Sequence, residues 1–211
     1  MPSGVEMVYL DQALIVVNKP AGLLAVPGRG LDKADCLSAR MQAIYPDAQI
    51  VHRLDMATSG LMLLARGTEA QRRMSAVFAE RRVTKTYVAV VDGLPAADAG
   101  EINLPLIADW PNRPRQKVDD RLGKPSCTRW QVLSRDPMRS QTRLCLQPVT
   151  GRSHQLRLHL SAIGHAILGD KLYASTAVAS AAPRLLLHAS RLQFDHPDHG
   201  QALDLASEPP F

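Results

Sequence analysis

Residues 52–61, His-Arg-Leu-Asp-Met-Ala-Thr-Ser-Gly-Leu, constrain the fold of this chain more than any other stretch. Residues 51–54 indicate a short extended segment, and residues 55–60 a tight loop whose Thr, Ser and Gly can satisfy their own backbone groups. Residues 61–65, Leu-Met-Leu-Leu-Ala, are typical of a buried strand. The pattern places Asp55 at a strand end, between rigid neighbours, and we interpret the stretch as a functional site.

The remaining hydrophobic pattern indicates short strands and few helices. One helix is expected where apolar residues recur at helical spacing, at Leu37, Met41 and Ile44. A second is expected after Thr68 and Gln71, which resemble a capping box, with an inward stripe of Ala70, Met74, Val77 and Phe78. Branched or alternating apolar residues predict strands over residues 14–18, 87–91, 127–133, 142–147 and 155–160. These elements predict an α+β (mixed α/β) fold with a central, mainly antiparallel sheet flanked by helices.

The length of the chain limits the number of hydrophobic cores, and so of domains, that it can form. At 211 residues the chain is long enough for one sizeable core and short for two, so we expect a single domain over residues 1–211. The apolar runs are too short to span a bilayer, and residues 1–10 lack the basic start and long apolar run of a secretory signal. We therefore expect a cytoplasmic monomer with no membrane segment.

The charge balance, 25 Lys and Arg against 20 Asp and Glu, favours a polyanionic partner without requiring one. Between Trp110 and Trp130 the basic residues outnumber the two acidic ones, Asp119 and Asp120. These basic residues are Arg113, Arg115, Lys117, Arg121, Lys124 and Arg129. They predict an exposed basic loop, although such clusters are often only solvated faces.

The sequence offers no clear metal ligands. Cys36, Cys127 and Cys145 are odd in number and widely spaced, which argues against both a disulfide framework and a zinc site. His154 and His159 are five residues apart, so on the strand expected there they point to opposite faces and cannot bind one metal ion. We expect no metal in the site.

The stretch His-Arg-Leu-Asp-x-x-Thr-Ser-Gly-Leu resembles the signature of the RluA family of pseudouridine synthases, in which the Asp is catalytic. Other stretches resemble further elements of this family in the expected order: Lys19-Pro-Ala-Gly22, Lys85-Thr-Tyr87, Gly151-Arg-Ser-His-Gln-Leu-Arg-Leu-His159 and Arg184-Leu-Leu-Leu-His-Ala189. The resemblance covers residues 14–205. It implies the pseudouridine synthase fold, an RNA substrate, and an isomerisation of uridine that uses no cofactor.

By this resemblance Asp55 is the catalytic carboxylate. An ionised Asp can act as a nucleophile on the ribose C1′ or on C6 of the base, or as a base at C2′, and the sequence leaves these three roles open. The commoner role of an Asp beside Thr58 and Ser59 is to cap a loop. The length of the motif favours the catalytic interpretation.

The resemblance assigns two further catalytic residues. Arg157 would pair with Asp55, keeping the carboxylate ionised and oriented beside the uncharged base. Tyr87 would lie against the target uracil, giving it a flat apolar surface and assisting removal of the C5 proton. Without the resemblance, Arg157 would be an ordinary ion-pair residue on a strand, and Tyr87 a core aromatic at a strand start.

A uridine stacked in RNA must be extruded before its C1′ and C6 are accessible. Arg53 is placed to fill the gap or to grip a neighbouring phosphate, although it could be a solvated loop charge. His52 would support the loop or contact the RNA backbone, without transferring protons. The other residues expected to bind RNA are Lys85, Arg152 and, in the basic loop, Arg113, Arg115 and Lys117.

Family members often carry an amino-terminal S4 domain, and only about a dozen residues precede the first predicted strand here, so we expect no S4 domain. The compact length, together with residues 24–29, 52–60 and 109–114, most resembles members that modify both 23S ribosomal RNA and the tRNA anticodon stem-loop. A family member with a different RNA target, an RNA-binding module without activity, and a hydrolytic glycosylase remain alternatives.

Overall fold

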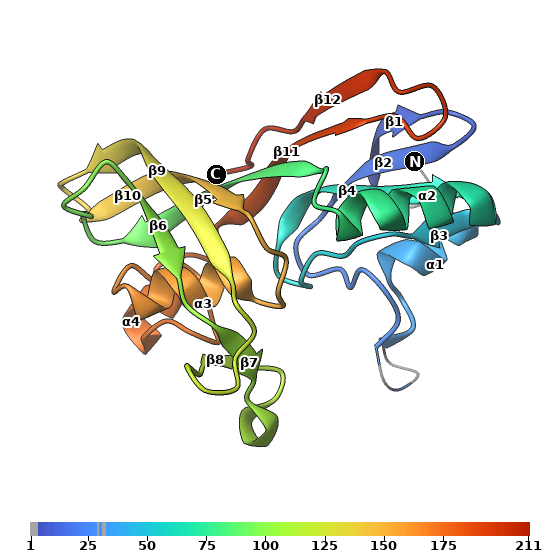
Figure 1. Ribbon diagram of the computed structural model, residues 1–211. Helices are drawn as coiled ribbons and strands as arrows, with labels where there is room; N and C mark the ends of the chain where they lie inside the picture. The colour runs from blue at the N-terminus through green and yellow to red at the C-terminus, as the bar shows by residue number, and fades with distance from the viewer. Residues whose placement is uncertain (1–3, 29, 31–32) are drawn as a thin grey trace. The chain divides into compact units, whose positions relative to one another are not determined.

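The computed structural model describes residues 4–28, 30 and 33–211, which form two compact units (Figure 1). Unit 1 combines residues 1–85 with residues 188–210, and unit 2 comprises residues 86–187 and Phe211. Within residues 24–29, Arg29 lies outside the described residues. The expectation of a single domain stays a prediction.

Unit 1 contains a sheet in the order β1-β2-β4-β11, with β12 added beside β11 and β3 beside β4. The strands are β1 (Glu6–Leu10), β2 (Leu14–Lys19), β3 (Ala48–Ile50), β4 (Ser59–Arg66), β11 (Leu187–Asp195) and β12 (Ala202–Ala206). Strands β4 and β11 are parallel, whereas the other pairs within this unit are antiparallel. The helices are α1 (Leu37–Gln42) and α2 (Gly67–Ala79).

Strand β4 is the centre of unit 1. All its residues except Arg66 are buried, as expected for a strand covered on both faces. Helix α2 packs Ala70, Met74 and Val77 into the core that also contains Leu61 and Leu63. The strand predicted over residues 61–65 is confirmed, and its burial fixes the point where the preceding loop of Asp55 ends.

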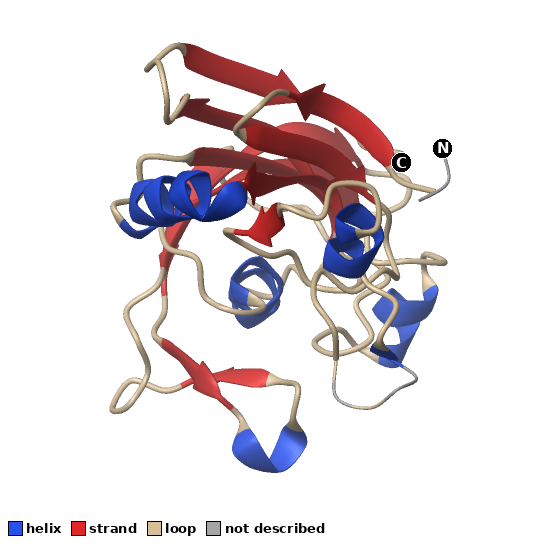
Figure 2. Ribbon diagram, turned by 90° about the vertical axis from the view of Figure 1, so that its right-hand side faces the viewer, coloured by secondary structure: helices blue, strands red, loops and turns tan. Residues whose placement is uncertain are grey.

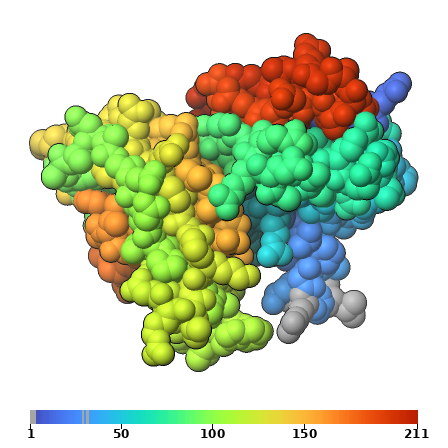
Figure 3. All heavy atoms as spheres, viewed as in Figure 1, coloured from blue at the N-terminus to red at the C-terminus, as the bar shows by residue number. Residues whose placement is uncertain are grey.

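Unit 2 contains an antiparallel sheet in the order β5-β10-β9-β6. Its strands are β5 (Thr84–Asp92), β6 (Ala99–Asn103), β9 (Cys127–Asp136) and β10 (Gln141–Pro148), and its helices are α3 (Gln155–Ala162) and α4 (Thr176–Ser180). A separate hairpin, β7 (Leu106–Ala108) and β8 (Gln116–Val118), carries the 3-10 helix η2 (Trp110–Asn112) at its tip (Figure 2). In the space-filling view this hairpin forms a lobe that projects from unit 2 (Figure 3).

The α+β class and the mainly antiparallel pairing are confirmed, but several local predictions are wrong. The strand predicted over residues 155–160 is helix α3, because Leu156 and Leu160 have the four-residue spacing of one buried helix face. The capping box is also wrong: α2 has no side-chain cap, and Gln71 donates instead to the carbonyl of Ile50. Ile44 lies beyond the end of α1 and is exposed.

Candidate active site

Backbone hydrogen bonds hold the loop of Asp55. The N–H of Thr58 donates to the carbonyl of Asp55 at 3.1 Å, and the N–H of Gly22 donates to the carbonyl of Met56 at 2.8 Å. Leu54 and Thr58 are buried on either side, while Asp55 itself is half-buried. Because the backbone closes this turn, the loop does not require the Asp55 side chain to close it.

Lys19 supports this loop from beneath. Its side chain is fully buried, and Nζ donates to the carbonyls of Pro20 at 2.9 Å, Leu23 at 2.8 Å and Met56 at 3.2 Å. A buried ammonium that is surrounded by carbonyl oxygens stabilises the loop only while those bonds are made. Lys19, the first residue of the Lys-Pro-Ala-Gly stretch, therefore supports the loop of Asp55 through the carbonyl of Met56.

The Ser-Gly pair of the motif joins the loop to β11. Gly60 has φ +112°, and a Cβ there would lie 2.3 Å from the carbonyl oxygen of Ala189, so only glycine fits. The hydroxyl of Ser59 hydrogen-bonds Nδ1 of the buried His188 at 2.8 Å. These two contacts explain why the motif continues through residues 59 and 60 after the loop has closed.

His52 packs against β4 and α2 directly before the loop of Asp55. Its Nε2 accepts the N–H of Leu63 at 2.9 Å, and its ring stacks on Phe78 with 4.6 Å between ring centres. Burial, helped by the charge of Lys85, lowers the pKa of His52 to about 3. The imidazole is therefore neutral near pH 7. These contacts suit the supporting role predicted for His52, and its contact with the RNA backbone stays a prediction.

Arg53 and Lys85 differ in their surroundings. Arg53 is exposed and has no ion-pair partner among the described residues. Lys85 is half-buried at the start of β5, and burial, followed by the charge of Arg81, lowers its pKa. Arg53 can therefore reach an anion in solvent, whereas the ammonium of Lys85 is partly shielded from solvent. The predicted contacts of both residues with RNA stay predictions.

In unit 2, Tyr87 lies on the helix-covered face of the sheet. It pairs with Leu146, which pairs in turn with Trp130, so these three side chains share one face. Thr128, two residues before Trp130, is on the same face and hydrogen-bonds Gln155 and His159 of α3. Tyr87 is half-buried, on the face of the sheet that α3 covers.

Arg157 is buried and gripped by Asp170. Its Nε donates to Asp170 Oδ2 at 2.8 Å, and its Nη2 donates to Oδ1 at 2.6 Å. Burial alone would raise the pKa of Asp170, but the hydrogen bonds and charge of Arg157 outweigh it and hold that pKa below its usual value. The carboxylate stays ionised, so the two-bond grip fixes the plane of the guanidinium.

Side chains also anchor the start of α3. Gln155 is buried, accepts from the Thr150 hydroxyl at 2.7 Å and the Arg152 N–H at 3.0 Å, and donates to the Cys127 carbonyl at 2.9 Å. His159 is buried as well, between Thr128 and the carbonyl of Leu104, and burial lowers its pKa. Because His159 is held by these two partners, it is a packing residue.

The basic residues of the hairpin are exposed, as predicted. Arg113 lies over the ring of the exposed Trp110, with Cζ 3.0 Å from its centre, and Arg115 lies 5.6 Å from the ring centre of Tyr173. Lys117 forms an ion pair with Asp119 at 3.2 Å. Arg152 is exposed before α3. An exposed aromatic ring beside guanidinium groups is a surface on which a nucleobase can stack.

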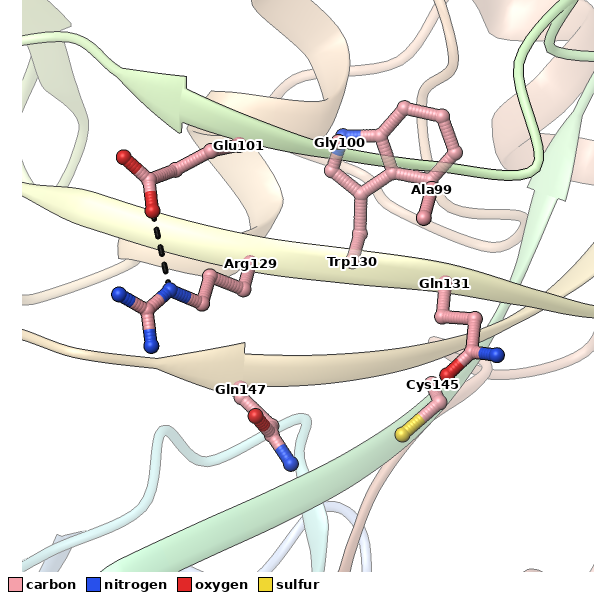
Figure 4. A pocket seen from close by; sticks show the side chains of 8 residues that line it. All are labelled: Ala99, Gly100, Glu101, Arg129, Trp130, Gln131, Cys145 and Gln147. Atoms are coloured by element: carbon pink, nitrogen blue, oxygen red, sulfur yellow. Dashed lines mark hydrogen bonds and ion pairs between the residues drawn. The ribbon is translucent and has the colours of Figure 1, made fainter.

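A hollow of about 500 Å³ on the sheet of unit 2 contains none of the predicted site residues (Figure 4). It is lined by Ala99, Gly100, Glu101, Arg129, Trp130, Gln131, Cys145 and Gln147. Cys145 alternates with Leu146 along β10, so the hollow's side chains at Cys145 and Gln131 point away from the face of Tyr87. Glu101 and Arg129 already satisfy each other at 3.0 Å.

In unit 2 the structure places Arg157 against Asp170 and Tyr173, two residues that the sequence did not indicate. Asp170 and Tyr173 were missed because each is more than twelve residues from Arg157 and belongs to no motif considered. The pairing of Asp55 with Arg157 stays a prediction, since the two residues belong to different units.

The described residues include no group of three or more potential metal ligands, and none of the described helices is long and apolar enough to cross a bilayer.

Comparisons with known proteins agree with one another. Residues 13–162 match the family described as RNA pseudouridylate synthase. The chain is 49% identical over 205 residues to the dual-specificity RNA pseudouridine synthase RluA of Yersinia pestis, covering 97% of this chain and 99% of that protein. It is 47% identical to the protein of that name from Escherichia coli K12, covering 97% of this chain and 93% of the other. Among solved structures, human RNA pseudouridylate synthase domain containing 1 is similar, with a TM-score of 0.82 and 28% identity over 100% of this chain and 86% of the other.

Proposed function

Because the chain belongs to the RNA pseudouridylate synthase family, we propose that it converts uridine to pseudouridine at defined positions in structured RNA. The observation that carries the proposal is the loop of Asp55: a half-buried carboxylate on a rigid turn, two residues after an exposed arginine. Such a loop can present a carboxylate to an extruded nucleoside while Arg53 replaces the base in the stack.

The proposed reaction breaks the bond from C1′ to N1, turns the base in place, and forms a bond from C1′ to C5. N1 gains a proton and C5 loses one, so the atoms balance without a redox step. Asp55 acts as nucleophile at C1′ or C6, or as base at C2′. Tyr87 supports the base and assists removal of the C5 proton, and Arg157 keeps the reacting carboxylate ionised and oriented.

We also propose two substrates, a 23S ribosomal RNA segment and the tRNA anticodon stem-loop, both modified in the cytoplasm by a monomer. Support comes from the relatives that are named dual-specificity synthases. The exposed arginines and Trp110 of the hairpin suit recognition of a stem-loop by its phosphates and unstacked bases.

Purified protein incubated with each synthetic stem-loop tests the activity. Nucleoside analysis should show pseudouridine in place of one uridine, with no change in mass and no base released. A glycosylase would release free uracil, and an inactive binding module would leave the RNA unchanged. Mapping pseudouridine in total RNA from cells with and without the gene then identifies the natural targets, and a map that changes at a single site would contradict dual specificity.

The salt dependence of RNA binding tests the hairpin. Replacing Arg113, Arg115 and Lys117 with Gln should reduce the slope of log Kd against log salt by about 2 to 3, because each cation displaces condensed counterions. The matched control is Arg139→Gln, which removes an exposed arginine from another part of unit 2. An unchanged slope in the triple variant would show that the hairpin does not contact RNA phosphates.

A further inference from the structure

One side chain, Tyr173, connects the basic hairpin to the buried ion pair of Arg157. The Tyr173 hydroxyl accepts the backbone N–H of Gln116 at 2.8 Å, and Gln116 is the first residue of β8. The same hydroxyl hydrogen-bonds Nδ1 of His154 at 2.7 Å, immediately before α3. A hydroxyl has one donor and two acceptor positions, so it can form both bonds together.

The backbone of Tyr173 contacts the ion pair directly. Its N–H donates to Asp170 Oδ1 at 3.2 Å, and this same oxygen accepts Nη2 of Arg157 at 2.6 Å. The Tyr173 ring also lies near two guanidinium groups, 5.3 Å from Cζ of Arg157 and 5.6 Å from Cζ of Arg115. Both distances are within the range in which a cation is attracted to an aromatic face.

His154 is the third point of this connection. Its φ is 56°, a left-handed conformation that a residue with a Cβ adopts at a cost of about 1 to 2 kcal/mol. The hydrogen bond to Tyr173 holds the side chain while the backbone enters α3, which carries Arg157 three residues later. Tyr173 therefore contacts β8, the start of α3 and the carboxylate that orients Arg157.

We propose that Tyr173 is a positioning residue that couples RNA binding by the hairpin to the orientation of Arg157. RNA held by the hairpin fixes β8, and the hydroxyl of Tyr173 transfers that constraint to Asp170 and Arg157. Hairpin contacts thus raise the turnover number as well as the affinity. The inference rests on the proposed function, since it takes Arg157 and the hairpin as parts of one synthase.

The first test is Tyr173→Phe, which removes the hydroxyl and keeps the ring. We expect kcat on a stem-loop substrate to fall about tenfold or more, the effect of a misplaced catalytic group, while Kd for the RNA changes less than about twofold. Tyr45→Phe is the matched control. Tyr45 also lies beneath an arginine, Arg66, at 5.3 Å, but its hydroxyl has no partner among the described residues. An unchanged kcat in Tyr173→Phe would overturn the proposal.

A double-mutant comparison separates coupling from general weakening. In the wild-type background, Arg113→Gln with Lys117→Gln should lower kcat and raise Kd. In the Tyr173→Phe background the same pair should raise Kd but leave kcat unchanged, because the connection is already broken. If the fold-losses in kcat from Tyr173→Phe and from the hairpin pair multiply in the combined variant, the two act independently. Tyr173 then has only a structural role, and the proposed coupling is wrong.

Gln116 supplies a second route if Tyr173→Phe does not fold. Its N–H points to Tyr173 and not to β7, so Gln116→Pro removes that donor without removing a bond between the two strands. Gln116→Ala keeps the donor and serves as its control. Proline should lower kcat as Tyr173→Phe does, and alanine should not; equal activities would overturn the inference. Absence of pseudouridine with wild-type protein would instead refute the proposed function.

Discussion

In unit 1 the loop of Asp55 is held by hydrogen bonds to backbone carbonyls, whereas in unit 2 Arg157 is held by side chains from other segments. The carbonyl of Met56 receives both the Gly22 N–H and the Lys19 ammonium. Arg157 depends on Asp170, thirteen residues away, and on the packing of α3 by Gln155. A turn held by its backbone tolerates changes in its own side chains, while a side-chain network is sensitive to each member.

The largest difference between the units should appear with Asp55→Asn. Because the backbone closes the turn, this variant should keep its fold and RNA affinity but lose at least about a thousandfold in kcat. Single-turnover kinetics, RNA binding and thermal unfolding measure the three properties. Asp35→Asn, at an exposed carboxylate paired with Arg40, is the control. Residual activity above a trace would remove Asp55 from the central role.

Asp170→Asn should instead affect fold and activity together. It removes the buried carboxylate that holds Arg157 at two points, which costs about 3 to 5 kcal/mol of unfolding free energy, and it loosens the guanidinium. Urea denaturation and kcat are the measurements. Asp204→Asn offers a matched comparison, since Arg191 and Asp204 form a similar two-bond pair that is exposed and should contribute less than about 1 kcal/mol. Equal losses of unfolding free energy in Asp170→Asn and Asp204→Asn would show that burial does not strengthen the pair of Arg157 and Asp170.

Lys19→Met tests the support beneath the Asp55 loop. Methionine fills a similar volume but leaves the carbonyls of Pro20, Leu23 and Met56 without their shared donor, so we expect a loss of about 2 to 3 kcal/mol. Activity should fall with normal RNA affinity, because the turn loses one of its anchors. Lys171→Met, at an exposed lysine in unit 2, is the control for loss of charge. A fully active Lys19 variant would show that Gly22 alone suffices.

The smallest effect concerns pH. His52 resists protonation in the folded state down to pH about 3, whereas in the unfolded chain it takes a proton near pH 6.5. The unfolded state therefore binds more protons between these values, and stability falls as pH falls. From pH 6.5 to pH 5 this costs about 2 kcal/mol, and His52→Gln should abolish that part of the slope. An unchanged slope would show that His52 is accessible to protons in the fold.

The same contrast explains which parts of the site could be predicted from sequence. The Asp55 loop and the strand after it are adjacent in the sequence and are marked by Thr, Ser and Gly, so local rules identify them. Helix α3 was mistaken for a strand because Leu156, Leu158 and Leu160 alternate with polar side chains, which is the period of one face of a strand. Asp170 and Tyr173 carry no local signal, since their partners are determined by how unit 2 packs.

The contact of Gly60 with Ala189 affects the order in which parts of the fold can form during synthesis. Ser59 and its partner His188 are 129 residues apart, and unit 2 is inserted between them. During synthesis the chain emerges from its amino terminus, so the loop of Asp55 is made early but lacks its β11 neighbour until residue 188 has emerged. Closing so long an intervening segment is slow compared with local pairing. The nascent enzyme should therefore acquire its Asp55 geometry last, although the residues of that motif are among the first to be made.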